Sequence, residues 1–139
     1  MVVRVVVAVT LFALLAVLAW WLERRRLSDA PTQTPGVPPT QLDRADFPRP
    51  EVPWLVVLFT SSTCESCAGL REKAAALESD EIVVTEVEYF ARPELHDRYH
   101  VDAAPMTLIA DAEGVVRVSF IGAFAAPELW TAVAELRAS

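Results

Sequence analysis

The chain has 139 residues with a mean hydropathy of +0.32, and 53% of its residues are hydrophobic. Its 12 Lys and Arg against 19 Asp and Glu give a net charge of −7, which excludes a generally basic nucleic-acid-binding protein. Two cysteines are too few for a disulfide-stapled mini-protein or for a zinc site of four cysteines. The apolar content instead indicates a membrane segment joined to one soluble domain.

The first predicted element is a membrane-spanning helix at residues 5–22, a run of 18 residues without a charge. A helix of about 17–25 residues spans a bilayer, and Trp20 and Trp21 stand where an interfacial aromatic belt is expected. A cleaved signal peptide is the alternative, but its apolar core would be shorter and would not end in the arginine triplet at 24–26. The sequence therefore predicts a single-pass anchor in the cell membrane over residues 1–26. The arginine triplet slightly favours a cytoplasmic location for the domain that follows.

Residues 27–53 form a predicted linker, because seven of the chain's ten prolines lie there. Such a segment buries too little apolar surface to fold and favours an extended spacer. Leu42 and Phe47 are nevertheless expected to pack on the following domain as a short lead-in. Residues 51–139 carry a net charge of −9, so the globular part is expected to avoid nucleic acid and anionic lipid.

The remaining residues, 54–139, alternate between strand and helix patterns. The apolar run at 54–59 predicts a central strand buried on both faces. Ser62 and Glu65 form a capping-box pattern that predicts the start of a helix. That helix is predicted to continue with Leu70, Ala74 and Leu77 on one face. A parallel strand at 82–89 and a short helix at 93–99 are predicted next. Paired strands at 106–110 and 115–120 and a last helix from Pro127 complete the prediction. This order predicts an α/β domain with a mixed sheet and helices on both faces.

The chemical signal is Cys64-Glu65-Ser66-Cys67, directly after the first strand and at the predicted helix start. Free N–H groups at a helix start stabilise a thiolate, and the C-x-x-C spacing lets the two sulfurs pair reversibly. A zinc site completed by His96 and His100 is one alternative, but 28 residues separate Cys67 from His96 and both histidines are expected on a solvated helix. A static structural disulfide is another, although so small a loop stabilises little.

Residues 54–136 resemble a thioredoxin-fold protein, with the two cysteines in the place of the family's motif. The segment Val101-Asp102-Ala103-Ala104-Pro105-Met106-Thr107 is similar to the family's segment that carries a cis-proline. The resemblance implies a cis Ala104–Pro105 bond facing the dithiol, where the Ala104 backbone would bind an extended substrate. It also implies that Gly122 lies beside the same groove. With Thr63, these are the predicted substrate-binding residues.

The chain departs from the family at several positions. Thioredoxins usually carry Trp-Cys-Gly-Pro-Cys, and their first strand–helix pair is largely missing here. The family's buried aspartate falls at Leu58, and its lysine neighbour falls at Glu86. We therefore predict that Glu86 approaches Cys67 from beneath the sheet, where burial would make its carboxylate a base for that thiol. The alternative is a Glu86 that points to solvent on a half-exposed strand.

Together these features predict a membrane-tethered thiol–disulfide oxidoreductase. The resemblance implies that Cys64 attacks a substrate disulfide and that Cys67 resolves the mixed disulfide, with no metal and no organic cofactor. The expected partners are protein or small disulfide substrates, an unidentified electron donor or acceptor, and the lipid bilayer around residues 5–22. A non-catalytic thioredoxin-fold binding or adaptor module at the membrane is the alternative function.

Overall fold

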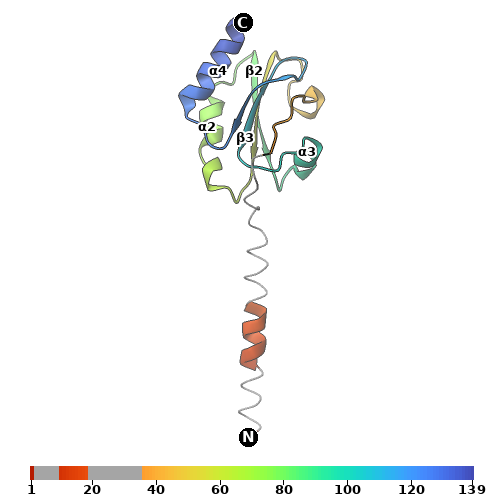
Figure 1. Ribbon diagram of the computed structural model, residues 1–139, viewed down its shortest axis with the longest axis vertical. Coiled ribbons are helices and arrows are strands. Elements are labelled where there is room, and N and C mark those ends of the chain that lie inside the picture. The colour runs from red at the N-terminus through yellow and green to blue at the C-terminus, as the bar shows by residue number, and fades with distance from the viewer. Residues whose placement is uncertain (2–9, 19–35) are drawn as a thin grey trace. The chain divides into compact units, whose positions relative to one another are not determined.

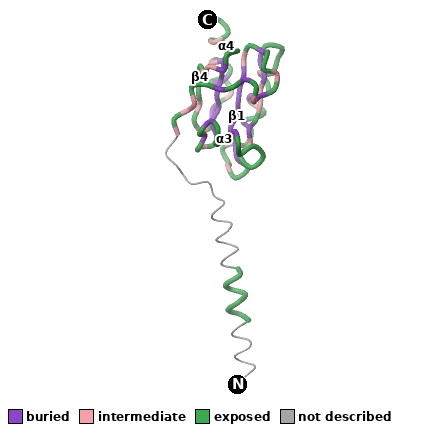
Figure 2. The backbone as a smooth tube through the Cα atoms, turned by 90° about the vertical axis from the view of Figure 1, so that its right-hand side faces the viewer, coloured by how far each residue is buried: buried purple, intermediate pink, exposed green. Residues whose placement is uncertain are grey.

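The computed structural model describes residue 1 and residues 10–18 and 36–139. Residues 10–18 are helical and exposed along their whole length (Figure 2). Over the described ranges, no helix combines the length and the apolar character needed to cross a membrane. The predicted membrane segment at 5–22 extends beyond the described residues on both sides, and linker residues 27–35 also lie outside them.

A four-stranded mixed sheet, in the order β2-β1-β3-β4, forms the centre of residues 36–139. β1 (Trp54–Thr60) pairs in parallel with β2 (Ile82–Glu88) and antiparallel with β3 (Met106–Ala110), and β3 pairs antiparallel with β4 (Val116–Ile121). All of β1 after its first residue is buried (Figure 2). This confirms the central strand that the apolar run predicted.

Helices cover both faces of the sheet, as the alternating pattern predicted (Figure 1). On one face, Val56 and Leu58 pack with buried residues of α2 (Leu70–Ala75) and α4 (Ala126–Ala138). On the other face, β1 packs with α3 (Pro93–Arg98) and with the lead-in, the segment before β1 that contains Leu42 and Phe47. The alternation of side chains along β1 therefore supplies both cores.

The lead-in is held to the domain by burial and by backbone contacts. Leu42 and Phe47 are buried, as expected, and the Leu42 N–H donates to the carbonyl of Gly114 at 2.8 Å. A 3-10 turn, η1 (Arg44–Asp46), follows, and the Asp43 N–H donates to the Tyr99 hydroxyl at 3.0 Å. The second half of the Pro-rich stretch is therefore part of the packed structure, because its few apolar residues fill the α3 face of the sheet.

The helix after β1 differs from the prediction. The capping box does not form: a separate 3-10 turn, η2 (Glu65–Cys67), has no side-chain cap, and α2 begins only at Leu70. Gly69 lies between the two with a φ of +75°, a left-handed conformation that interrupts a right-handed helical path. Cys67 therefore lies in a three-residue turn that Cys64 directly precedes, and neither cysteine lies at the start of a long helix.

Candidate active site

The sheet register brings three predicted site segments to one end of the domain. Phe59, near the end of β1, lies opposite Met106 at the start of β3, and Met106 lies opposite Ile121 at the end of β4. The dithiol loop follows the first of these strands, Pro105 directly precedes the second, and Gly122 directly follows the third. The Gly122 N–H donates to the Pro105 carbonyl at 2.8 Å. The Ala104–Pro105 bond is cis, as the resemblance implied.

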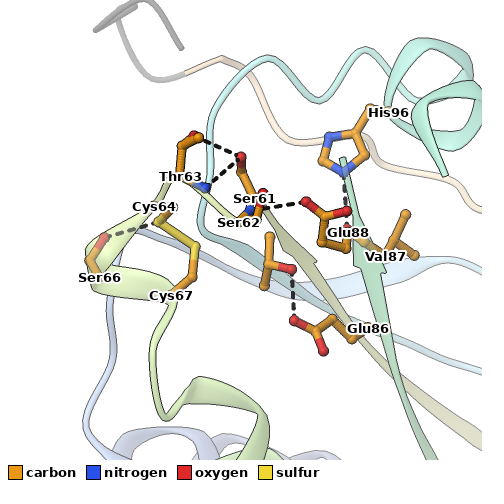
Figure 3. Close-up of a disulfide and its surroundings, with 11 residues drawn as sticks. Ser61, Ser62, Thr63, Cys64, Ser66, Cys67, Glu86, Val87, Glu88 and His96 are labelled. Carbon is orange, nitrogen blue, oxygen red and sulfur yellow. Dashed lines mark hydrogen bonds between the residues drawn. A yellow bond between two sulfur atoms is a disulfide. The ribbon is translucent and has the colours of Figure 1, made fainter. Parts of the chain in front are cut away.

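Cys64 and Cys67 form a disulfide, with their Cα atoms 5.4 Å apart. Both cysteines are half-buried in this state. The Ser66 Oγ lies 3.4 Å from the Cys64 Sγ, and Figure 3 shows the serine side chain directed at that sulfur. The arrangement presents a disulfide to solvent with a hydroxyl group against one of its two sulfurs.

The loop between β1 and the disulfide is held by polar side chains. The Ser61 and Thr63 hydroxyls lie 3.0 Å apart, and the Ser62 N–H donates to the Glu88 carboxylate at 2.9 Å (Figure 3). Glu88 also accepts from the Ala91 N–H at 2.9 Å. Desolvation raises the pKa of Glu88, but the N–H groups of Ser62 and Ala91 outweigh it and hold that pKa below its ordinary value. The carboxylate thus joins the dithiol loop to the loop after β2.

Glu86 is not buried, which corrects the environment predicted for it. Its side chain is 29% exposed, accepts a 2.8 Å hydrogen bond from the Thr60 hydroxyl and lies 3.7 Å from the Arg71 guanidinium. Glu86 and Arg71 line a groove of about 430 Å³ together with Leu58. Glu86 lies on an edge strand of the sheet, where solvent reaches its carboxylate.

His96 is buried, although its helix was expected to be solvated. Its ring nitrogens lie 3.0 Å from the Val87 carbonyl oxygen and 3.3 Å from the Val101 carbonyl oxygen. The ring therefore connects the end of β2 to the segment that leads into Pro105. It contacts backbone oxygens and not the cysteines, which is a structural role and not the role of a zinc ligand with Cys64 and Cys67.

The solved structures that are similar to this chain include two thioredoxins. The germline-specific thioredoxin Deadhead (Thioredoxin-1) from Drosophila melanogaster has a TM-score of 0.54 at 23% identity, over 63% of this chain and 84% of that chain. A mutant thioredoxin from Halobacterium salinarum NRC-1 has a TM-score of 0.52 at 18% identity, over 59% of this chain and 73% of that chain. No protein-family model and no curated protein matches the sequence. The domain therefore has a thioredoxin-like fold that carries a C-x-x-C disulfide.

Sequence reasoning missed two polar contacts at this site. Ser66 differs from the residue that the family's motif carries, and its position between the cysteines is the signal that its hydroxyl can reach a sulfur. Glu88 shares a strand face with Glu86 by the period of two, but its contact with Ser62 depends on how β1 and β2 pair. The four predicted substrate-binding residues lie in the loops at the dithiol end of the sheet, and their contact with a substrate stays a prediction.

Proposed function

We propose that this protein is a membrane-tethered thiol–disulfide oxidoreductase that exchanges disulfides through Cys64 and Cys67. The observation that carries the proposal is the half-exposed disulfide between these residues, at the sheet end where the cis Ala104–Pro105 bond lies. A thioredoxin-like fold supports a redox role in general terms. A buried disulfide far from any loop would have favoured a structural role instead.

In the proposed reaction, the Cys64 thiolate of the reduced protein attacks one sulfur of a substrate disulfide. The substrate disulfide breaks, one substrate thiol leaves, and a mixed disulfide forms on Cys64. The Cys67 thiolate then attacks the Cys64 sulfur, which releases the second substrate thiol and forms the intramolecular disulfide. The substrate gains two electrons and the protein dithiol loses them. An electron donor of the dithiol class must reduce the pair again.

The substrate is proposed to lie against Thr63, Ala104, Pro105 and Gly122. Ala104 is exposed, and the adjacent Pro105 is buried and accepts a hydrogen bond from the Gly122 N–H, so an extended peptide is proposed to pair with the Ala104 backbone. Glu86 remains a candidate base for Cys67. Its carboxylate is partly open to solvent in the groove beside α2, and the proposal that it acts on Cys67 rests on its position in the family register.

The tether is proposed from the sequence of residues 5–22. The described part of that run, residues 10–18, is a helix whose exposed side chains include Leu11, Phe12 and Leu14. Exposed apolar side chains along a helix favour lipid over water as the surrounding medium. A tether would direct the dithiol to substrates and electron partners at the membrane, and the arginine triplet favours the cytoplasmic side.

Two variants of the full chain in detergent micelles test the proposal. Cys64→Ser is expected to abolish the reduction of a small model disulfide. Cys67→Ser is expected to attack once and to accumulate a mixed disulfide that mass spectrometry detects. Ser119→Ala, which removes an exposed hydroxyl on β4, is the control and should behave as wild type. Absence of exchange in the wild-type chain would sink the proposal and favour the adaptor function.

A further inference from the structure

Cys64 precedes a short turn and not the first turn of a long helix. The Cys67 N–H donates to the Cys64 carbonyl and the Ala68 N–H donates to the Glu65 carbonyl, both at 3.2 Å. The turn that contains them is only three residues long and ends before Gly69. The long helix that the sequence predicted directly after Cys64 is therefore replaced by a three-residue turn, and the Glu65 carboxylate next to Cys64 opposes a negative charge on sulfur.

The Ser66 hydroxyl supplies a hydrogen-bond donor to the Cys64 sulfur. Its Oγ lies 3.4 Å from the Cys64 Sγ, and no other hydrogen bond to that sulfur occurs within residues 36–139. A sulfur in a disulfide carries no hydrogen, so the serine hydroxyl must be the donor in this contact. Reduction turns the same sulfur into a thiolate, and a hydrogen bond to a charged acceptor is about twice as strong as a neutral one.

We propose that Ser66 is a catalytic residue whose hydroxyl hydrogen-bonds to the Cys64 thiolate and favours the reduced form of the pair. This inference rests on the proposed exchange reaction. When a dithiol reductant reduces the protein, its first thiolate forms a mixed disulfide with Cys64 and Cys67 leaves as a thiolate. The second thiol of the reductant then attacks the reductant's first sulfur, which is bonded to Cys64 in that mixed disulfide. Cys64 leaves as a thiolate with the S–S electron pair, and the reductant becomes a disulfide.

The hydroxyl acts on the second of these steps, because only then does Cys64 carry the charge. It therefore raises the reduction potential of the pair and increases the fraction of Cys64 that is ionised at a given pH. Ser66 is exposed, so the serine does not support the core, and its removal should leave the fold intact. The effect of one exposed hydrogen bond of this kind is about threefold to tenfold in an equilibrium constant.

Two measurements on the full chain in detergent micelles test the role of Ser66. In a dithiothreitol redox buffer, Ser66→Ala should lower the equilibrium constant for reduction about threefold to tenfold, which is about 15–30 mV for a two-electron couple. In a Cys67→Ser background, which isolates Cys64, the same change should move the pH profile of iodoacetamide alkylation upward by about 0.5–1 pH unit. Ser66→Thr keeps a hydroxyl and should restore both properties, and Ser119→Ala should change neither.

The outcomes separate this inference from the proposed function. If Ser66→Ala matches the wild type in both the potential and the pH profile, the role of Ser66 is refuted even when exchange is active. If Ser66→Thr behaves as Ser66→Ala, the hydroxyl is not the active group and the inference also fails. Failure of the wild-type chain to catalyse exchange would overturn the proposed function, but the potential and the alkylation profile would still report on the contact between Ser66 and Cys64.

Discussion

Replacement of Gly114 by alanine is expected to detach the lead-in from the domain. Gly114 has a φ of +82°, and a Cβ at this position would lie 2.0 Å from the Leu42 carbonyl oxygen, well inside the 3.0 Å that real Cβ atoms keep. Leu42 must therefore move. Its movement breaks the 2.8 Å hydrogen bond from the Leu42 N–H to the Gly114 carbonyl and exposes a side chain that is 1% exposed in the fold.

Three contributions add to the expected loss of stability. A non-glycine residue in the left-handed conformation costs about 1–2 kcal/mol, the lost hydrogen bond about 0.5–1.5 kcal/mol, and exposure of the leucine side chain about 1.5–3 kcal/mol. Gly114→Ala should thus lower the free energy of unfolding by about 3–6 kcal/mol. Gly69→Ala is the matched control, because Gly69 has a φ of +75° but nothing within 4 Å of an added Cβ. It should lose only the first contribution, about 1–2 kcal/mol.

Urea denaturation of the full chain in detergent micelles, followed by tryptophan fluorescence, measures both glycine variants. Gly114→Ala should unfold at a clearly lower urea concentration than Gly69→Ala. Its lead-in should also become sensitive to protease under native conditions, because residues that were packed on the sheet become accessible. Equal losses for the two variants would refute the reasoning, since the clash with Leu42 would then contribute nothing.

Three further predictions concern the dithiol end of the domain and the anchor. The pKa of Glu88 is lowered in the fold, so its contribution to stability is present above the ordinary value of 4.5 and is lost as the pH falls through the lowered one. Glu88→Gln should therefore destabilise the chain more at neutral pH than at about pH 3, and an equal loss at both pH values would contradict this. Glu86→Gln should slow resolution by Cys67 more than attack by Cys64 in single-turnover trapping of the mixed disulfide. Unchanged rates for both steps would exclude Glu86 as the base. Alkaline phosphatase fused after Ser139 should be inactive if the domain is cytoplasmic. Replacement of the arginines at 24–26 by serine should then make the fused phosphatase active. Phosphatase activity in the unmodified fusion would refute the predicted cytoplasmic orientation.

The sequence was sufficient for the features that depend on local pattern. The uninterrupted apolar run of β1, the β-branched run of β2 and the turn that ends in Gly114 each predicted its element, because burial and backbone preference act over a few neighbouring residues. The pair Cys64 and Cys67 also predicted its own disulfide chemistry, since its spacing lets the two sulfurs meet. The cis bond before Pro105 followed from the resemblance, and the structure confirms it.

Tertiary structure alone decided which polar groups meet. Glu86 and Glu88 lie two residues apart on one strand, yet the edge position leaves Glu86 open to solvent while the pairing of β1 with β2 brings Glu88 to the Ser62 N–H. His96 was expected in solvent because its helix is polar, but α3 packs that ring against carbonyl oxygens from two other segments. Hydrogen-bond partners that are distant in sequence depend on strand register and on how the helices pack. The residues next to a given position in the chain do not determine either of these.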